Sequence, residues 1–234
     1  MKWVRDHTGR FEKRPHYERG ELDLECEKLV ASFLKRKYGA VEFPISTEDL
    51  CLLVEKCVDD LEPYADLPED TFGVTVFTPG KKPKVKISRA LSENPRMANP
   101  FRTTLTHELG HVTFHSFLFD LSASTPSLFE DASTAEARQC LRQNIIAAST
   151  ADWMEWQAGY ACGATLMPLT PLRNLLDRLL ELRRPALPLP MEAANGLVQE
   201  VVSSFSVSVE AAKVRLSQLG YITDKAVSLP IHWC

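Results

Sequence analysis

The sequence predicts an α+β fold that is mostly helical, with a small twisted β-sheet and a C-terminal helical pair. Two observations predict it: apolar residues recur at helical spacing along most of the chain, and between residues 71 and 88 the spacing changes to short alternating runs. With 44% hydrophobic residues in 234, the chain can bury a substantial core. We assign 1–184 to one domain with its core at 70–168, and 185–234 to the helical pair and a tail. Whether this pair packs on the same domain is left open.

The first twenty residues are polar and basic. We expect an arm that packs on the body through Trp3, Phe11 and Tyr17, in preference to a nucleic-acid contact. The arm has no apolar core of the kind that a signal peptide carries.

Helical periodicity accounts for most of the remaining chain. Residues 21–38 have apolar positions three and four apart, and Gly39 is typical of the residue just past a helix end. Residues 46–61 begin with Ser46, a capping residue, followed by acidic residues suited to a first turn. The same spacing predicts further helices at 99–118, 136–148, 152–167, 172–184, 192–205 and 208–219.

Residues 72–77 and 85–88 are β-branched or aromatic runs separated by a turn cluster at 78–83. They predict a β-hairpin that lies beside the helix at 99–118. The second run alternates basic and apolar residues, which is typical of an edge strand. Such a strand can receive a substrate as an added strand, and its candidate residues are Val85, Lys86, Ile87 and Ser88.

The helix at 99–118 contains the motif H-E-x-x-H at 107–111. His107 and His111 lie one turn apart on one face, so both rings can reach one metal ion. Glu108 projects about 60° around the helix from His111, which suits contact with a water better than with the metal. Neutral nitrogen ligands beside a carboxylate are what a catalytic zinc needs. We therefore expect one Zn²⁺ per chain. The alternative is two hydrogen-bonded histidines on a half-buried helix.

This helix is expected to start at Asn99, a capping residue, followed by Pro100 at the first helical position. Apolar residues cover most of its surface beside the histidine face, so we expect it to be largely buried. Buried histidines need polar partners, and a metal ion supplies one.

A catalytic zinc usually takes three protein ligands, so one more is needed. His115 lies two turns from His107, too far along a straight helix to share the ion. It is a candidate oxyanion donor or a neighbour of the ligands, and Tyr160 is a weaker donor candidate. The acidic residues downstream of the motif remain open as the third ligand: Asp120, Glu130, Asp131, Glu136, Asp152 and Glu155.

Glu155 is favoured because small residues share its face of the predicted helix. Small residues let two helices approach closely, which brings a carboxylate on one helix within reach of a metal on the other. We expect Ala158 and Gly159 near this contact. Cys162 should point to the same interface without binding the metal.

These motifs together resemble the ImmA/IrrE family of metallo-endopeptidases, over residues 70–168. The matching segments are the T-H-E-L-G-H run at 106–111, F-H at 114–115, E-W-Q-A at 155–158 and L-M-P at 166–168. The resemblance implies a zincin-like domain with His107, His111 and Glu155 as zinc ligands and Glu108 as the general base. It also implies a helix-turn-helix repressor or similar regulator as the protein substrate. The sequence departs from the family at Gly159, where Asn or Asp is common near a ligand histidine, and at Ala161, where an aromatic residue is common.

Two other functions remain open. The first is a regulatory protein that binds a repressor or DNA without proteolysis, using this domain or the C-terminal helical pair as a helix-turn-helix. Its second helix mixes Glu210 with Lys213 and Arg215, and the chain carries a net charge of −4. Both facts argue against a nucleic-acid partner. The second is a zinc hydrolase of another class, such as an amidase.

The location is expected to be cytoplasmic. The sequence has no apolar run near 18 residues, so no membrane span is predicted. Its six cysteines are scattered and form no C-x-x-C pair, which indicates reduced core residues and no second, structural zinc. The sequence leaves the oligomeric state open.

Overall fold

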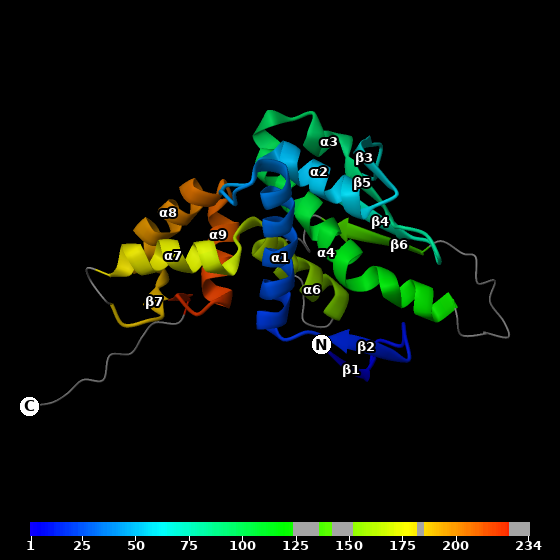
Figure 1. Ribbon diagram of the computed structural model, residues 1–234, viewed down its shortest axis with the longest axis horizontal. Coiled ribbons are helices and arrows are strands. Elements are labelled where there is room, and N and C mark those ends of the chain that lie inside the picture. The colour runs from blue at the N-terminus through cyan, green and yellow to red at the C-terminus, as the bar shows by residue number, and fades with distance from the viewer. Residues whose placement is uncertain (124–135, 142–151, 182–184, 225–234) are drawn as a thin grey trace, which may run out of the picture.

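The computed structural model describes residues 1–123, 136–141, 152–181 and 185–224. Within them the chain is α+β, mostly helical with small sheets, as the sequence predicts (Figure 1). None of the described helices combines the length and the apolar character that a membrane crossing requires.

The N-terminal arm is a hairpin of β1 (Lys2–Arg5) and β2 (Lys13–His16), paired antiparallel. Its expected packing on the body is confirmed, because three of its aromatic rings meet rings of the central helix edge to face. These pairs are Trp3 with Phe117, Phe11 with Phe119 and Tyr17 with Phe114.

Two helices follow the hairpin. α1 spans Arg19–Tyr38 and ends at Gly39, whose φ of 76° is the left-handed conformation that glycine favours. α2 spans Thr47–Cys57, and the Ser46 side chain accepts from the Asp49 amide as its cap. The prediction of a helix to residue 61 was wrong, because from Asp60 the chain joins the sheet instead.

The main sheet contains four described strands in the order β3-β5-β4-β6. β5 pairs parallel with β3 and antiparallel with β4, and β4 pairs antiparallel with β6. The predicted hairpin is therefore confirmed as β4 and β5. The strands span Asp60–Ala65 (β3), Thr71–Phe77 (β4), Lys84–Ser88 (β5) and Glu136–Leu141 (β6).

The prediction that the second hairpin strand lies at a sheet edge was wrong. β5 is hydrogen-bonded on both sides, so Val85, Lys86, Ile87 and Ser88 offer no open edge to an added strand. Its basic residues balance acidic residues at and beside β3: Lys84 lies 3.8 Å from Asp59 and Lys86 lies 3.1 Å from Glu62. The alternation of charge thus marks pairing with an acidic neighbour.

The prediction of a helix at 136–148 was also wrong where the structure tests it. Residues 136–141 form β6, because pairing with β4 overrides the local helical spacing. Residues 124–135 and 142–148 lie outside the described residues.

The central helix is α4, Ala98–Ala123 (Figure 1). It contacts α6, α2 and the strand β4, so the expected sheet beside this helix is confirmed. It begins one residue before the predicted Asn99 cap, and Pro100 falls inside its first turn, where no amide partner is needed. The segment between β5 and α4 contains α3 (Arg89–Ser92) and the 3₁₀ turn η1 (Pro95–Met97).

The helices after β6 were predicted, but their bounds differ: α7 spans 169–180 in place of 172–184, and α8 begins at 195, after the 3₁₀ turn η2, in place of 192. The C-terminal pair packs its apolar face into the same core as α2 and α4. The elements are α6 (Trp153–Leu166), α7 (Leu169–Leu180), β7 (Leu189–Pro190), η2 (Met191–Ala194), α8 (Asn195–Phe205), α9 (Val209–Gln218) and β8 (Ile222–Thr223).

A buried ion pair ties α9 to α1. Arg215 is fully buried, and its Nη2 donates to Asp23 Oδ1 at 2.6 Å, while its Nε donates to the Met167 carbonyl. The Tyr160 hydroxyl donates to Asp23 Oδ2 at 2.9 Å. Arg215 therefore stabilises the helical pair on the body and does not face a DNA surface.

Candidate metal centre

Three side chains from α4 and α6 meet at one point. His107 and His111 of α4 and Glu155 of α6 each offer a ligand atom, and these atoms all lie within 4.8 Å of one another. The two histidine Nε2 atoms are 3.1 Å apart. Glu155 Oε2 lies 3.2 Å from His107 Nε2, and its Oε1 lies 3.3 Å from His111 Nε2. The structure thus brings together the three residues that the sequence and the family resemblance single out.

The donor set fits a zinc ion. His107 and His111 are 0% and 1% exposed and Glu155 is 8% exposed, so all three atoms lie away from bulk water. Burial by itself would raise the pKa of Glu155, but hydrogen bonds and charge interactions with the two histidines outweigh it and hold this pKa below its usual range. Two imidazoles and an ionised carboxylate are a common ligand set of catalytic zinc.

The other acidic candidates for the third ligand either form hydrogen bonds away from the cluster or have no described side chain. Asp152 caps α6 and pairs with both Nη atoms of Arg10, at 2.9 and 2.6 Å. Asp120 accepts from the Gly80 amide. Glu130 and Asp131 lie outside the described residues, and Glu136 belongs to β6, where only the backbone is described.

Glu108 lies beside the cluster and is not one of its three ligand residues. It is 0% exposed, and its Oε2 accepts from the Thr75 hydroxyl of β4 at 2.5 Å. Its Oε1 has no hydrogen-bond partner among the described residues. Burial raises the pKa of Glu108, against the opposing influence of His111, His107 and Thr75.

β4 passes so close to Glu108 that a side chain at position 73 would force the Glu108 and Thr104 side chains to shift. A Cβ on Gly73 would lie 2.5 Å from Glu108 Oε1 and 2.8 Å from the Thr104 methyl. Neither Gly73 nor Thr75 was predicted from the sequence. A glycine inside a strand of β-branched residues is a signal of close approach that was available.

The expected close contact of α4 with α6 is present, but a different glycine makes it. A Cβ on Gly110 would lie 3.0 Å from Ala158 Cα and 3.1 Å from its carbonyl oxygen. A Cβ on Gly159 would meet nothing within 4 Å, so the expectation that Gly159 lies at the contact was wrong. Ala158 is fully buried there, as predicted.

Cys162 points to α4 and stays outside the ligand cluster, as expected. Its Sγ lies 3.2 Å from the Thr106 hydroxyl and 3.4 Å from the Thr103 carbonyl. Burial raises the pKa of this thiol to about 11, so it remains protonated and is a poor metal ligand.

The two candidate oxyanion donors lie away from the metal-facing atoms. His115 Nδ1 is 3.0 Å from His111 Nδ1, on the side of that ring opposite Nε2. Burial first, and then the charge of His111, place the pKa of His115 well below its usual value. Tyr160 is engaged with Asp23, and burial raises its pKa to about 12. These positions favour His115 as a neighbour of the ligands.

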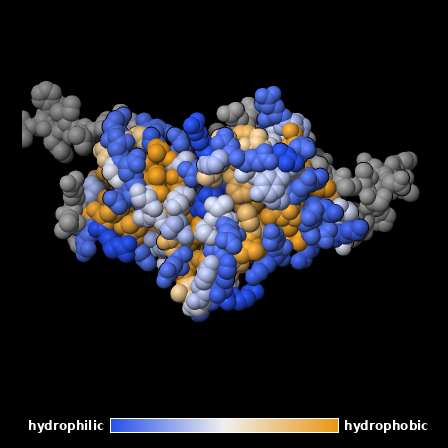
Figure 2. Space-filling model, turned by 90° about the horizontal axis from the view of Figure 1, so that it is seen from above, coloured by the Kyte–Doolittle hydropathy of each residue, from blue (hydrophilic) through white to orange (hydrophobic). Residues whose placement is uncertain are grey.

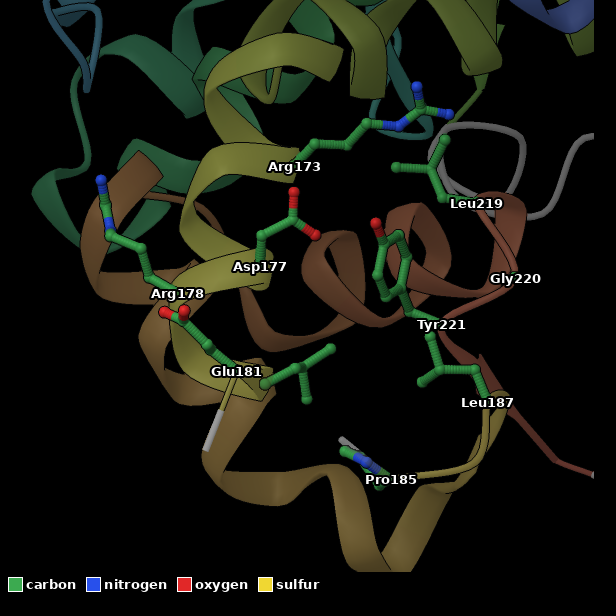
Figure 3. A pocket seen from close by; sticks show the side chains of 10 residues that line it. Arg173, Asp177, Arg178, Glu181, Pro185, Leu187, Leu219, Gly220 and Tyr221 are labelled. Carbon is green, nitrogen blue, oxygen red and sulfur yellow. The ribbon is translucent and has the colours of Figure 1, made fainter. Parts of the chain in front are cut away.

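A separate surface cavity of about 700 Å³ lies between α7 and the segment around β8 (Figure 3). Its walls include Arg173, Asp177 and Tyr221 and contain none of the cluster residues. Hydrophilic side chains cover much of the face seen in Figure 2, with smaller apolar patches between them.

No protein-family model matches the chain, and no match was found among curated proteins or solved structures. What the chain does is therefore inferred from the geometry of its site and from the motif resemblance.

Proposed function

We propose that the protein is a zinc-dependent endopeptidase of the H-E-x-x-H type with a zincin-like domain. The observation that carries this proposal is the convergence of His107, His111 and Glu155 with the Glu108 carboxylate beside them. His107, His111 and Glu155 would hold one zinc ion per chain. Zinc bound in this way supplies Lewis acidity, which lowers the pKa of a water molecule and polarises a substrate carbonyl.

Glu108 is the general base in this proposal. It takes a proton from the attacking water and delivers it to the leaving amine. The Thr75 hydroxyl holds one carboxylate oxygen, which leaves Oε1 to exchange the proton. Burial raises the pKa of Glu108 above its usual value, which is the direction that lets a carboxylate both take and return a proton.

The substrate is proposed to be a protein, and the family resemblance favours a helix-turn-helix repressor or similar regulator in the cytoplasm. A peptide that binds by strand addition needs an outer strand. In the described part of the sheet the outer strands are β3 and β6, so the segment at 85–88 is not part of this proposal.

The decisive experiment compares Glu108→Gln with wild type in zinc content and in cleavage of repressors encoded beside the gene. The variant keeps the size of the side chain but cannot accept the proton. It should retain zinc and lose about 10²–10⁴ in turnover. Glu200→Gln, at an exposed position on α8, is the matched control and should cleave as wild type does.

Loss of zinc in Glu108→Gln would make Glu108 a ligand and contradict the assignment. Absence of cleavage by the wild type, together with a biological role that survives Glu108→Gln, would favour the regulatory binding protein. Cleavage of small amides but not of proteins would favour the amidase. The burial of Arg215 argues against α9 as a DNA-reading helix in the regulatory alternative.

A further inference from the structure

A chain of hydrogen-bonding groups runs from the N-terminal hairpin to the back of His111. The Pro15 carbonyl of β2 accepts from Gln157 Nε2 at 3.0 Å. Gln157 Oε1 lies 3.0 Å from His115 Nε2, and His115 Nδ1 lies 3.0 Å from His111 Nδ1. The three side chains are at most 1% exposed, so water does not compete for these contacts.

The Pro15 carbonyl determines which group donates and which accepts in each hydrogen bond of the series from Pro15 to His111. A carbonyl oxygen only accepts, so the Gln157 amide nitrogen must face it, and the Gln157 oxygen must face His115. That oxygen requires a proton on His115 Nε2. In the neutral ring His115 Nδ1 is then an acceptor, and His111 Nδ1 must carry the proton that it accepts. The lone pair of His111 consequently lies on Nε2, which faces His107 and Glu155.

We infer that Gln157, anchored on the Pro15 carbonyl, is a positioning residue that acts through His115 to fix the tautomer and orientation of His111 for metal binding. This inference deepens the proposed function and rests on its metal site. It assigns a role to His115 and makes the N-terminal hairpin a working part of the centre.

The hairpin is held firmly where the chain of hydrogen bonds begins. Arg10 binds Asp152 through two hydrogen bonds at the start of α6, at 2.9 and 2.6 Å. Trp153 Nε1 donates to Asp6 Oδ1 at 3.2 Å. Both contacts lie at the start of α6, about one turn before Gln157, and hold the hairpin that carries Pro15 against this helix.

The support is specific to one of the two histidine ligands. His107 Nδ1 is buried and has no hydrogen-bond partner among the described residues. Among the described residues, then, His111 has a hydrogen-bonding partner behind its ring at Nδ1 and His107 has none. Groups that hydrogen-bond to a metal-binding histidine typically contribute 10–100-fold to metal affinity.

The first test measures zinc affinity by competition with a chelator. Gln157→Met keeps the approximate shape but removes both polar groups, and it should weaken zinc binding by about 10–100-fold. Gln157→Glu retains an acceptor oxygen for His115 but has no amide N–H for the Pro15 carbonyl, so it should restore only part of the affinity. Thr165→Val, buried on the same helix two turns on, is the control for altered packing and should bind zinc as wild type does. Wild-type affinity in Gln157→Met would overturn the inference.

The second test uses the unaltered chain and does not depend on the variants folding. Nitrogen-15 NMR of labelled histidines should show the His115 proton on Nε2 with and without zinc, and the His111 proton on Nδ1 in the zinc-loaded protein. A His115 proton on Nδ1 would overturn the inference. If the wild type bound no zinc, the proposed function would fail, while the His115 tautomer would still decide whether Gln157 sets the ring.

Discussion

Gly110→Ala should push α6 away from α4 and weaken the metal centre. The added Cβ would lie 3.0 Å from Ala158 Cα, 3.1 Å from Ala158 O and 3.2 Å from Ala161 Cβ. These atoms belong to the backbone or to a side chain without rotamers, so no side chain can rotate away. The helix itself has to shift by a few tenths of an ångström, and it carries Glu155 with it.

The expected size follows from two opposing contributions. Overpacking a dense core costs about 1–3 kcal/mol. Alanine in place of glycine inside a helix returns about 0.8–1 kcal/mol. The free energy of unfolding should therefore fall by about 1 kcal/mol, within a range of about 0 to 2 kcal/mol. Zinc affinity should fall about tenfold, at the lower end of the effect of altered ligand support.

Gly159→Ala is the matched control, because its Cβ would meet nothing within 4 Å. It should stabilise the protein by about 0.8–1 kcal/mol and leave zinc affinity unchanged. Urea unfolding followed by circular dichroism measures the first quantity, and chelator competition measures the second. Equal stabilisation by alanine at both positions, with equal zinc affinity, would refute the helix contact described here.

Three further predictions concern other contacts. Thr75→Val removes a hydroxyl donor to the Glu108 carboxylate, so zinc content should persist while cleavage falls. Asp23→Asn leaves Arg215 buried without its counter-ion and should lower the free energy of unfolding by about 3–5 kcal/mol, measured in urea. Burial by itself would raise the pKa of Asp49, but its lysine, serine and tyrosine partners lower this pKa by more. The net pKa is below its usual value, so the ionised form of Asp49 stabilises the fold. The stability difference between wild type and Asp49→Asn should be constant at neutral pH and shrink as the pH falls through 3.8.

The elements that hold the candidate centre were predictable because their signals are local. The spacing of His107 and His111 is a property of one helix, and α4 forms where that spacing requires it. Glu155 lies in the first turn of α6, which Asp152 caps, and the small residues of this helix indicated that it could approach α4. No pairing between distant segments was needed for either step.

The errors concern the sheet, where neighbours come from distant parts of the chain. The basic alternation of β5 was taken as an edge signal, but Asp59 and Glu62 balance it from the side of β3. β6 forms at 136–141 because β4 has an unpaired side that a helix would leave open. In each case the competing local pattern was real, and long-range pairing decided the outcome.

The role of Gln157 at the centre could not be predicted from local sequence. Its partner Pro15 lies 142 positions away, so no spacing on α6 distinguishes it from an ordinary buried amide. The resemblance showed Gly159 where Asn or Asp is common near a ligand histidine, and in this chain Gln157 and His115 lie behind His111 instead. A buried amide with one side fixed by a carbonyl and the other facing an imidazole has only one orientation that satisfies both groups. Gln157 belongs to the centre because both ends of its amide have fixed partners, which a residue type in a sequence does not reveal.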